Sequence, residues 1–280
     1  MLDAVVSYLR CPHCAAALAR DRSVLRCAGG HAFDIARQGY VNLLPPSARA
    51  RTGDTAAMVQ ARVDFLAAGH FAEIDAALVE AAREGMPDTG SGCVVDIGAG
   101  TGHYLRAVLD VLPGRAGIAL DTSVYALRRA ARVHERVGAV VADVWATLPI
   151  ADGAAGLALD VFAPRNGPEL RRLLRPGGRL LVVTPTTDHL RELRAPLGLL
   201  RVDEQKDERL RTTLEPSFAL VGQRTVRSPL TLHHDDVRAA VGMGPSAWHM
   251  GAMLADRIAA LPDPIPVTAA VVLSVFRPSS

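Results

Sequence analysis

A regular alternation of short apolar runs and helix-like segments, from residue 93 to residue 193, most constrains what this 280-residue chain can fold into. The apolar runs are typical of strands buried on both faces, and the segments between them carry helical spacing. This alternation predicts a Rossmann-like α/β fold with a parallel, doubly wound sheet. The expected strands are 93–97, 117–121, 137–143, 156–162 and 178–185, and the expected helices are 103–111, 123–134, 168–174 and one that includes His189 and Leu193.

The segments on either side of this alternation have different patterns. Between Thr55 and Glu84, apolar residues recur at helical spacing with a break at Gly69, which predicts two helices that lead into the sheet. Residues 218–227 and 267–277 are strand-like, with no crossover helix expected between them. We therefore expect these two strands to pair antiparallel at one edge of the sheet.

Near the N-terminus, a cysteine and histidine array predicts a bound metal ion. The pairs CPHC and CAGGH place Cys11, Cys14, Cys27 and His31 at spacings typical of a tetrahedral zinc site. Two disulfides, or thiols scattered in a core, are the alternatives, but disulfides would leave His31 without a role. We expect the site to take up the chain's cysteines, and we expect it to be structural because four ligands leave no open position.

Composition narrows the class of protein. Hydrophobic residues make up 49% of the chain, which is typical of a globular protein, yet no apolar run approaches the roughly 18 residues of a membrane span. The stretch before Cys11 is too short for a secretory signal, so we expect a cytoplasmic protein with no membrane partner. The net charge of +2 neither demands nor excludes nucleic acid. Arginines crowd the first fifty residues; they could form a basic face, or simply replace lysine on solvated faces.

The first predicted strand ends in a glycine-rich loop, which predicts a ligand site. The sequence VVDIGAGTG places Asp96, Gly98, Gly100 and Gly102 at the carboxyl end of this strand. Glycines are needed where the backbone turns sharply and lets a ligand approach closely. In open α/β sheets, ligands bind beyond the carboxyl ends of the strands, where the strand order reverses.

Two further carboxylates end the next two predicted strands and help to identify the ligand. Asp121 stands where an acidic side chain can bind a ribose diol, and Asp143 stands where an adenine amine can be met. Three carboxylates argue against a pyrophosphate and suit a cofactor with an ammonium, a sulfonium and a ribose, which describes S-adenosylmethionine. The alternative is that Asp121 and Asp143 only cap helices.

These motifs resemble those of class I S-adenosylmethionine methyltransferases. The resemblance rests on Asp96–Gly102, Asp121, Asp143 and the Arg175–Gly178 turn before the fifth predicted strand. Enzymes that methylate exocyclic amines of bases usually have an Asn/Asp-Pro-Pro-aromatic loop after the fourth strand, whereas this chain has Ala163-Pro164 there. An exocyclic amine is therefore a less favoured target. Covalent attack by cysteine is also disfavoured, because we expect the cysteines to bind zinc.

Longer motifs resemble the family of 23S rRNA guanine-N1 methyltransferases over almost the whole chain, and the branch that confers resistance to tylosin-type or mycinamicin-type macrolides most of all. The motifs are CPHC with CAGGH, FDIARQGYVNLL, MVQARVDFLAAGHF, VVDIGAGTGHY, VFAPRN, TPTTDHLREL and MGPSAWH. The resemblance implies a zinc domain over residues 1–44 that helps to bind RNA, a helical linker over 45–90 and a methyltransferase domain over 91–280. It also implies a homodimer whose protomers form a cleft for a ribosomal RNA hairpin.

The same resemblance implies which residues contact S-adenosylmethionine. The matching positions are Phe71, Thr101, Gly102 and His189. Phe71 departs from the tyrosine common in the family, so stacking would survive but a phenolic hydrogen bond would not.

The chemistry of guanine N1 suggests what else the site must contain. N1 is protonated at neutral pH and lies on the Watson–Crick edge, so the base must be unpaired or flipped, and its proton needs an acceptor. Asp160 is our candidate acceptor, with a structural strand-end role as the alternative. Trp145 and Trp248-His249 either line the substrate pocket or pack in a core, and Arg165 either holds RNA or forms a surface ion pair.

Two other functions remain open on the sequence. A small-molecule methyltransferase, acting on a quinone or a polyketide, would share the glycine loop but would not explain the zinc array. A non-catalytic RNA-binding protein with a vestigial cofactor fold would not need the set of Asp96, Asp121 and Asp143.

Overall fold

The computed structural model describes residues 2–45, 54–86, 92–199, 213–244 and 253–279, and one eight-stranded sheet runs through it. The strand order is β10-β11-β9-β8-β5-β6-β7-β4, and β11 is the antiparallel member. The order reverses between β5 and β8, as in a doubly wound sheet. The bounds are β4 Tyr40–Asn42, β5 Cys93–Ile97, β6 Gly117–Asp121, β7 Val137–Val141, β8 Ala155–Val161, β9 Leu174–Pro185, β10 Phe218–Leu232 and β11 Ile265–Pro278.

Successive residues of the central strands bury their side chains on opposite faces of this sheet. Val94 of β5 belongs to one apolar core, and Val95 belongs to the other. Helices α1 Ala56–Ala67, α2 Ala72–Gly85, α3 His103–Val111, α4 Val124–Ala130, α6 Arg191–Leu197, α8 His234–Gly242 and α9 Met253–Ala259 contribute to the first core. The second core is closed by the 3₁₀ turns η1 Leu2–Ala4 and η2 Val6–Tyr8 and by α5 Gly167–Leu173.

The predicted alternation is confirmed, with shifted ends. Helix α4 ends at Ala130, and Arg175–Gly178 is part of β9, which starts early and has an irregular register beside β8. His189 lies in the turn before α6. The long strands β10 and β11 pair antiparallel at the edge, as predicted.

The zinc-binding segment forms a small sheet of its own, β1 Leu18–Asp21, β2 Val24–Cys27 and β3 Ala32–Asp34. After β3 the chain turns between Ala36 and Tyr40, where Gly39 has a φ of +95°. It then forms β4, which pairs parallel with β7 of the main sheet. Val41 and Leu43 are fully buried there, so burial of these side chains accounts for the extra strand.

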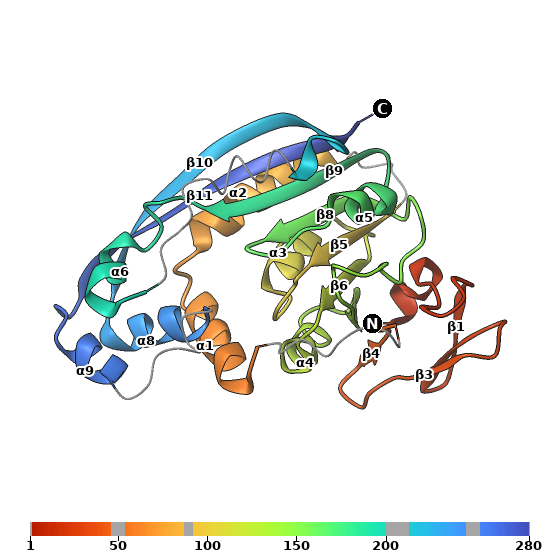
Figure 1. Cartoon of the computed structure of the whole chain (residues 1–280), viewed down its shortest axis with the longest axis horizontal. Coiled ribbons are helices and arrows are strands. Elements are labelled where there is room, and N and C mark those ends of the chain that lie inside the picture. Colours follow the sequence, from red (N-terminus) through yellow and green to blue (C-terminus); the bar gives the residue numbers. More distant parts are fainter. Residues whose placement is uncertain (1, 46–53, 87–91, 200–212, 245–252, 280) are drawn as a thin grey trace.

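The zinc segment and the large sheet share one apolar core. Val5 of the N-terminal turns packs so closely on Gly138 of β7 that a Cβ there would lie 2.1 Å from the valine Cγ2. Figure 1 shows the zinc segment in red at one end of the molecule and α6, α8 and α9 at the other end. Among the described residues, no helix is long and apolar enough to cross a membrane.

Candidate functional site

The four predicted metal ligands converge on one point. The ligand atoms of Cys11, Cys14, Cys27 and His31 all lie within 4.8 Å of one another. The Cys14 and Cys27 sulfurs are 3.6 Å apart, and the His31 Nδ1 lies 3.5 Å from the Cys11 sulfur and 3.4 Å from the Cys27 sulfur. In a tetrahedral site with Zn–S near 2.3 Å and Zn–N near 2.0 Å, neighbouring ligand atoms are about 3.5–3.8 Å apart. The donor set and its spacing therefore fit zinc.

The fourth cysteine is a correction to the sequence analysis. Cys93 is not part of the metal cluster but lies in β5, where it is fully buried and its thiol faces the Ala154 carbonyl. Burial raises the pKa of this thiol to about 12. A buried, protonated thiol is a poor nucleophile, so the expectation of no covalent catalysis by cysteine now rests on burial rather than on zinc.

The glycine loop after β5 is shaped by close backbone approach. Gly98, Gly100 and Gly102 all have positive φ, between 53° and 77°. A Cβ on Gly98 would lie 2.7 Å from the Cβ of Ala163, so the loop after β5 is in direct contact with the loop after β8. Thr101, between the last two glycines, is buried. Glycine is thus required here for both conformation and contact.

Asp121 and Asp143 both bind backbone amides at the ends of their strands. The two carboxylate oxygens of Asp121 accept hydrogen bonds from the Gly100 amide at 2.8 Å and from the Ser123 amide at 2.7 Å. Asp143 accepts one from the Trp145 amide at 3.0 Å. Asp121 therefore joins the glycine loop to Ser123, which is itself the N-cap of α4. Each Asp121 oxygen keeps a second lone pair for a ligand.

Asp96 is the acidic residue of the site with the most unusual environment. Its side chain is buried, and its Oδ2 has no hydrogen-bond partner among the described residues. Burial, with the neighbouring carboxylates Asp160 and Asp121 in support, raises the pKa of Asp96 well above its ordinary value. A buried acidic cluster with an unpaired oxygen is a site for a cation. The ammonium and sulfonium groups of S-adenosylmethionine fit this requirement.

Arg62 of α1 is a residue that sequence reasoning missed. One guanidinium nitrogen pairs with Asp54 at 2.5 Å and lies 3.3 Å from the place of a Cβ on Gly100, and the other donates to the Met243 carbonyl at 2.8 Å. Arg62 therefore links the glycine loop to α1 and to the end of α8. The missed signal is that Arg62 falls on the buried stripe of α1 with Met58, where a charge requires partners.

Asp160 and Arg165 form an ion pair under the loop after β8. The Asp160 side chain is completely buried, and its Oδ1 accepts from two nitrogens of Arg165, at 2.9 and 3.2 Å. The same guanidinium donates to the Ala163 carbonyl at 3.1 Å. The ion pair therefore fixes the conformation of the loop after β8.

Three rings gather beside this loop. Phe71, Phe162 and His189 have ring centroids 5.6 to 6.2 Å apart, although they come from the start of α2, the end of β8 and the turn after β9. The His189 Nδ1 accepts from the Ala270 amide at 3.2 Å, which leaves the proton on Nε2. Phe71 and His189, two positions that the resemblance assigns to cofactor contact, thus lie together, and the position of Phe162 beside them was not foreseen.

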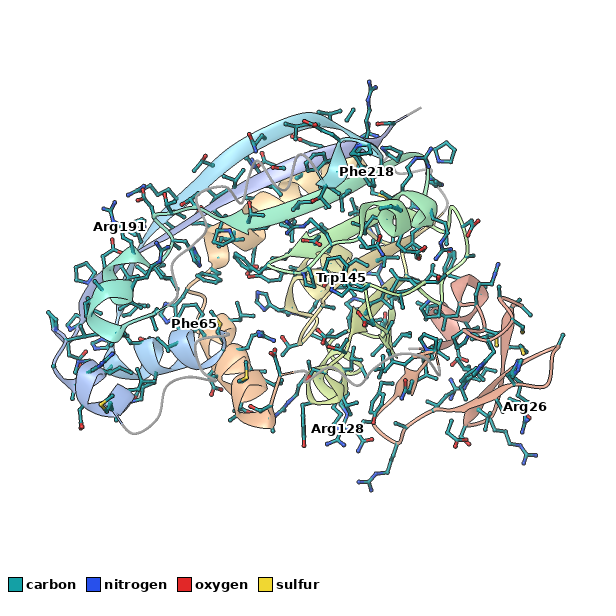
Figure 2. All side chains as sticks on the ribbon, in the orientation of Figure 1. Arg26, Phe65, Arg128, Trp145, Arg191 and Phe218 are labelled. Carbon is teal, nitrogen blue, oxygen red and sulfur yellow. The ribbon has the colours of Figure 1, made fainter. Side chains whose placement is uncertain are left out.

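Of the two tryptophans, only Trp145 lies in the part of the chain that the structure describes. Trp145 is 53% exposed, so it does not pack in a core, and in Figure 2 it lies well away from Arg26 of the zinc segment. Trp248-His249 lies outside the described residues.

Comparisons with known proteins identify the fold and the family. A crystal structure described as a methyltransferase from Bacillus halodurans C-125 matches 72% of this chain and 97% of its own, with a TM-score of 0.51 and 18% identity. The strand order, the glycine loop and this likeness define the class I methyltransferase fold.

The particular family follows from relatives that match from end to end. The chain is 53% identical to the 23S rRNA (guanine(748)-N(1))-methyltransferase of Streptomyces fradiae, over 98% of each chain. It is 52% identical, again over 98% of each chain, to a protein of Micromonospora griseorubida named as a 23S rRNA (guanine-N(1)-)-methyltransferase. The family model "RlmA, N-terminal", a zinc ribbon, matches residues 9–50. The chain belongs to the 23S rRNA (guanine-N1)-methyltransferase family.

Proposed function

We propose that this protein transfers a methyl group from S-adenosylmethionine to N1 of a guanine in an unpaired loop of 23S rRNA. The observation that carries the proposal is the extent of the family match, which covers 98% of this chain. It includes the zinc segment as well as the sheet, and a small-molecule methyltransferase would have no need of that segment. The buried acidic cluster around Asp96 supports the choice of a cationic methyl donor.

In this proposal, the cofactor lies against the carboxyl ends of β5, β6 and β7. When bound, the cofactor would supply an electrophilic methyl group for transfer. Asp96 balances the positive charge of the cofactor. The glycine loop, which has no side chains at its glycines, lets the cofactor lie close to the backbone. Asp121 and Asp143 bind the ribose and the adenine. The rings of Phe71 and His189 exclude water on the other side. The residues assigned to cofactor binding are Phe71, Asp96, Gly98, Gly100, Thr101, Gly102, Asp121, Asp143 and His189.

We assign Asp160 a positioning role in place of the proton acceptor that the sequence suggested. Its carboxylate is completely buried and bound to Arg165 at 2.9 Å. A carboxylate that is completely buried and held by a guanidinium is poorly placed to meet the proton of a bound guanine. Arg165 in turn fixes the loop that follows β8, next to the glycine loop.

In this proposal, the zinc segment selects the RNA substrate. The chain works as a cytoplasmic homodimer. Exposed arginines of the segment, among them Arg22 and Arg37, offer charge for RNA phosphates. His13 is exposed and stacks on His31 and Phe33, with ring centroids 4.7 and 5.6 Å apart, and so presents a flat face beside the metal ligands. Sedimentation at micromolar concentration tests the dimer; a monomer would contradict it.

The activity is tested by incubating the purified protein with S-adenosylmethionine and protein-free 23S rRNA, followed by primer extension. A methyl group on guanine N1 blocks base pairing, so reverse transcriptase should stop at one guanine in a hairpin loop. A reaction without S-adenosylmethionine serves as the control. Transfer to no guanine of this RNA would refute the assignment, and methylation of a quinone instead would favour the small-molecule rival.

We further propose that the modification protects its host from tylosin-type or mycinamicin-type macrolides. The motifs of the chain support this, since they resemble that branch of the family. Expression in a macrolide-sensitive bacterium should raise the inhibitory concentration of such a drug, and expression of Asp96→Asn should raise it less. Equal susceptibility in both strains, with the RNA fully methylated, would assign the protein a housekeeping role.

A further inference from the structure

Phe162 combines exposure with an uncommon backbone conformation. It directly follows β8, at the point where the strand order of the sheet reverses, and its side chain is 39% exposed. Its φ is +57°, in the left-handed region that favours glycine. A bulky residue in this region is a true outlier, and such outliers concentrate at functional sites.

The surrounding contacts hold Phe162 in this conformation. Its amide donates to the Val183 carbonyl of β9 at 3.1 Å. Three residues further on, the loop is fixed by Arg165, and then by Asn166, whose side-chain amide donates to the Val144 carbonyl at 3.1 Å. A glycine would fit this backbone without strain. The chain instead places a phenyl ring here and leaves it open to solvent.

The position of the ring favours one ligand over another. The expected ribose and adenine positions follow β6 and β7, on one side of β5, whereas Phe162 follows β8, on the other side. The loop of Phe162 touches the glycine loop, since Ala163 lies against Gly98. The ring is therefore beside the methyl-donor end of the cofactor site and away from the adenine end.

We propose that the exposed face of the Phe162 ring stacks on the target guanine and presents its N1 to the methyl group. Phe71 and His189 lie beside the ring, with centroids at 6.2 and 5.7 Å, and help to hold it in place. Aromatic side chains commonly hold unstacked RNA bases in this way, and guanine has a large π-face. This assignment rests on the proposed function, because it names the residue that positions its substrate.

Three variants test the assignment. Phe162→Tyr keeps a ring, Phe162→Leu keeps apolar bulk without one, and Phe162→Gly removes the side chain while relieving the left-handed backbone. We measure kcat/KM for an rRNA hairpin that contains the mapped guanine, and the Kd of S-adenosylmethionine by calorimetry. Tyr125→Leu removes another exposed ring, one that packs on Arg128 of α4, and is the matched control.

The expected result is a loss confined to the RNA. Phe162→Leu and Phe162→Gly should lower kcat/KM for the hairpin about 10- to 100-fold, as expected for one lost base stack, with the cofactor Kd unchanged. Phe162→Tyr should stay within about 3-fold of the wild type, and Phe162→Gly should melt no lower than the wild type. Together these outcomes distinguish a loss of base stacking from a loss of protein stability.

Several outcomes would overturn the assignment. Wild-type rates for Phe162→Leu, beside an active wild type, would remove Phe162 from the substrate site and leave the proposed function intact. A cofactor Kd weakened as much as kcat/KM would make Phe162 a cofactor residue instead. A wild-type protein that methylates no guanine would refute the proposed function itself, and this assignment with it.

Discussion

The zinc site and the site at the carboxyl edge of the sheet gather polar groups in different ways. The zinc ligands lie between Cys11 and His31, and local turns bring them together. The other site draws Asp96, Asp121 and Phe162 from three strand ends, and Phe71 and His189 from still other segments. The first site needs only a short stretch of chain and a metal ion. The second exists only when the whole sheet is formed, so its residues are inseparable from the fold.

The largest expected effect comes from removing the metal. Cys27→Ser, or treatment with a strong chelator, should unfold the zinc segment, because binding of structural zinc is worth about 10 kcal/mol or more in small zinc domains. Since Cys11 and Cys27 share a core with Val5 and the sheet, we expect the β7 edge to loosen as well. Hydrogen exchange should show lost protection in residues 2–45 and in β7, and little change in β9.

The control is Cys93→Ser, a cysteine change outside the metal cluster. It should leave the zinc content at one equivalent per chain. A zinc-free protein with unchanged exchange in β7 would break the proposed coupling between the two regions.

The next effect concerns the buried ion pair of the sheet site. Arg165→Leu leaves the Asp160 carboxylate buried without this guanidinium and should lower the free energy of unfolding by about 3–5 kcal/mol. The double variant Asp160→Leu, Arg165→Leu should recover much of this loss, because it buries no charge. Urea denaturation of the wild type, Asp160→Leu, Arg165→Leu and the double variant gives the coupling energy. Additive losses would show that the pair does not act as a unit.

Asp96 should show opposite effects on stability and on binding. Because burial raises its pKa, the folded apo protein holds this proton more tightly than the unfolded chain does. Apo stability should therefore fall as the pH rises from the ordinary carboxyl range toward the raised pKa, while affinity for the cationic cofactor rises over the same window. Asp96→Asn should flatten both profiles, raise the melting temperature of the apo protein at pH 7 and weaken cofactor binding about 10- to 100-fold.

Calorimetry and thermal melts at several pH values measure these profiles. Wild-type cofactor affinity in Asp96→Asn would remove this carboxylate from the binding site. Asp110→Asn, an exposed carboxylate on α3, is the control and should behave as the wild type in binding.

The smallest expected effect lies at the outer rim of the sheet site. Asp188 precedes His189 and pairs with Arg227 at 2.5 Å and with Arg191 at 3.0 Å. The hydrogen bond from Arg227 lowers the pKa of Asp188, so this residue stabilises the fold above the ordinary carboxyl pKa and loses that effect as the pH falls through the lowered value. Asp188→Asn should shift the urea midpoint slightly at pH 7, not at pH 2, and less in high salt. An equal shift at both pH values would contradict an ionic contribution.

The features that could be predicted from the sequence are those that depend on local spacing, and the features that were missed depend on the packing of distant segments. The zinc ligands, the strands β5 to β9 and the carboxylates at their ends depend on local spacing, which a sequence displays directly. The strand β4 was missed because its partner β7 is distant in sequence, and a three-residue run carries little pattern. The ion pair of Asp160 with Arg165 and the backbone of Phe162 depend on packing that no local signal reports.

The pairing of β4 with β7 has a consequence for the order in which the chain folds. Tyr40 lies opposite Ala139, so β4 can find its place only after most of the central strands have been synthesised. The zinc hairpin, in contrast, can close as soon as His31 leaves the ribosome, because its contacts are local. The N-terminus should thus emerge as a metal-bound unit with its β4 strand still unpaired, and it should dock onto the sheet only once β7 has been made.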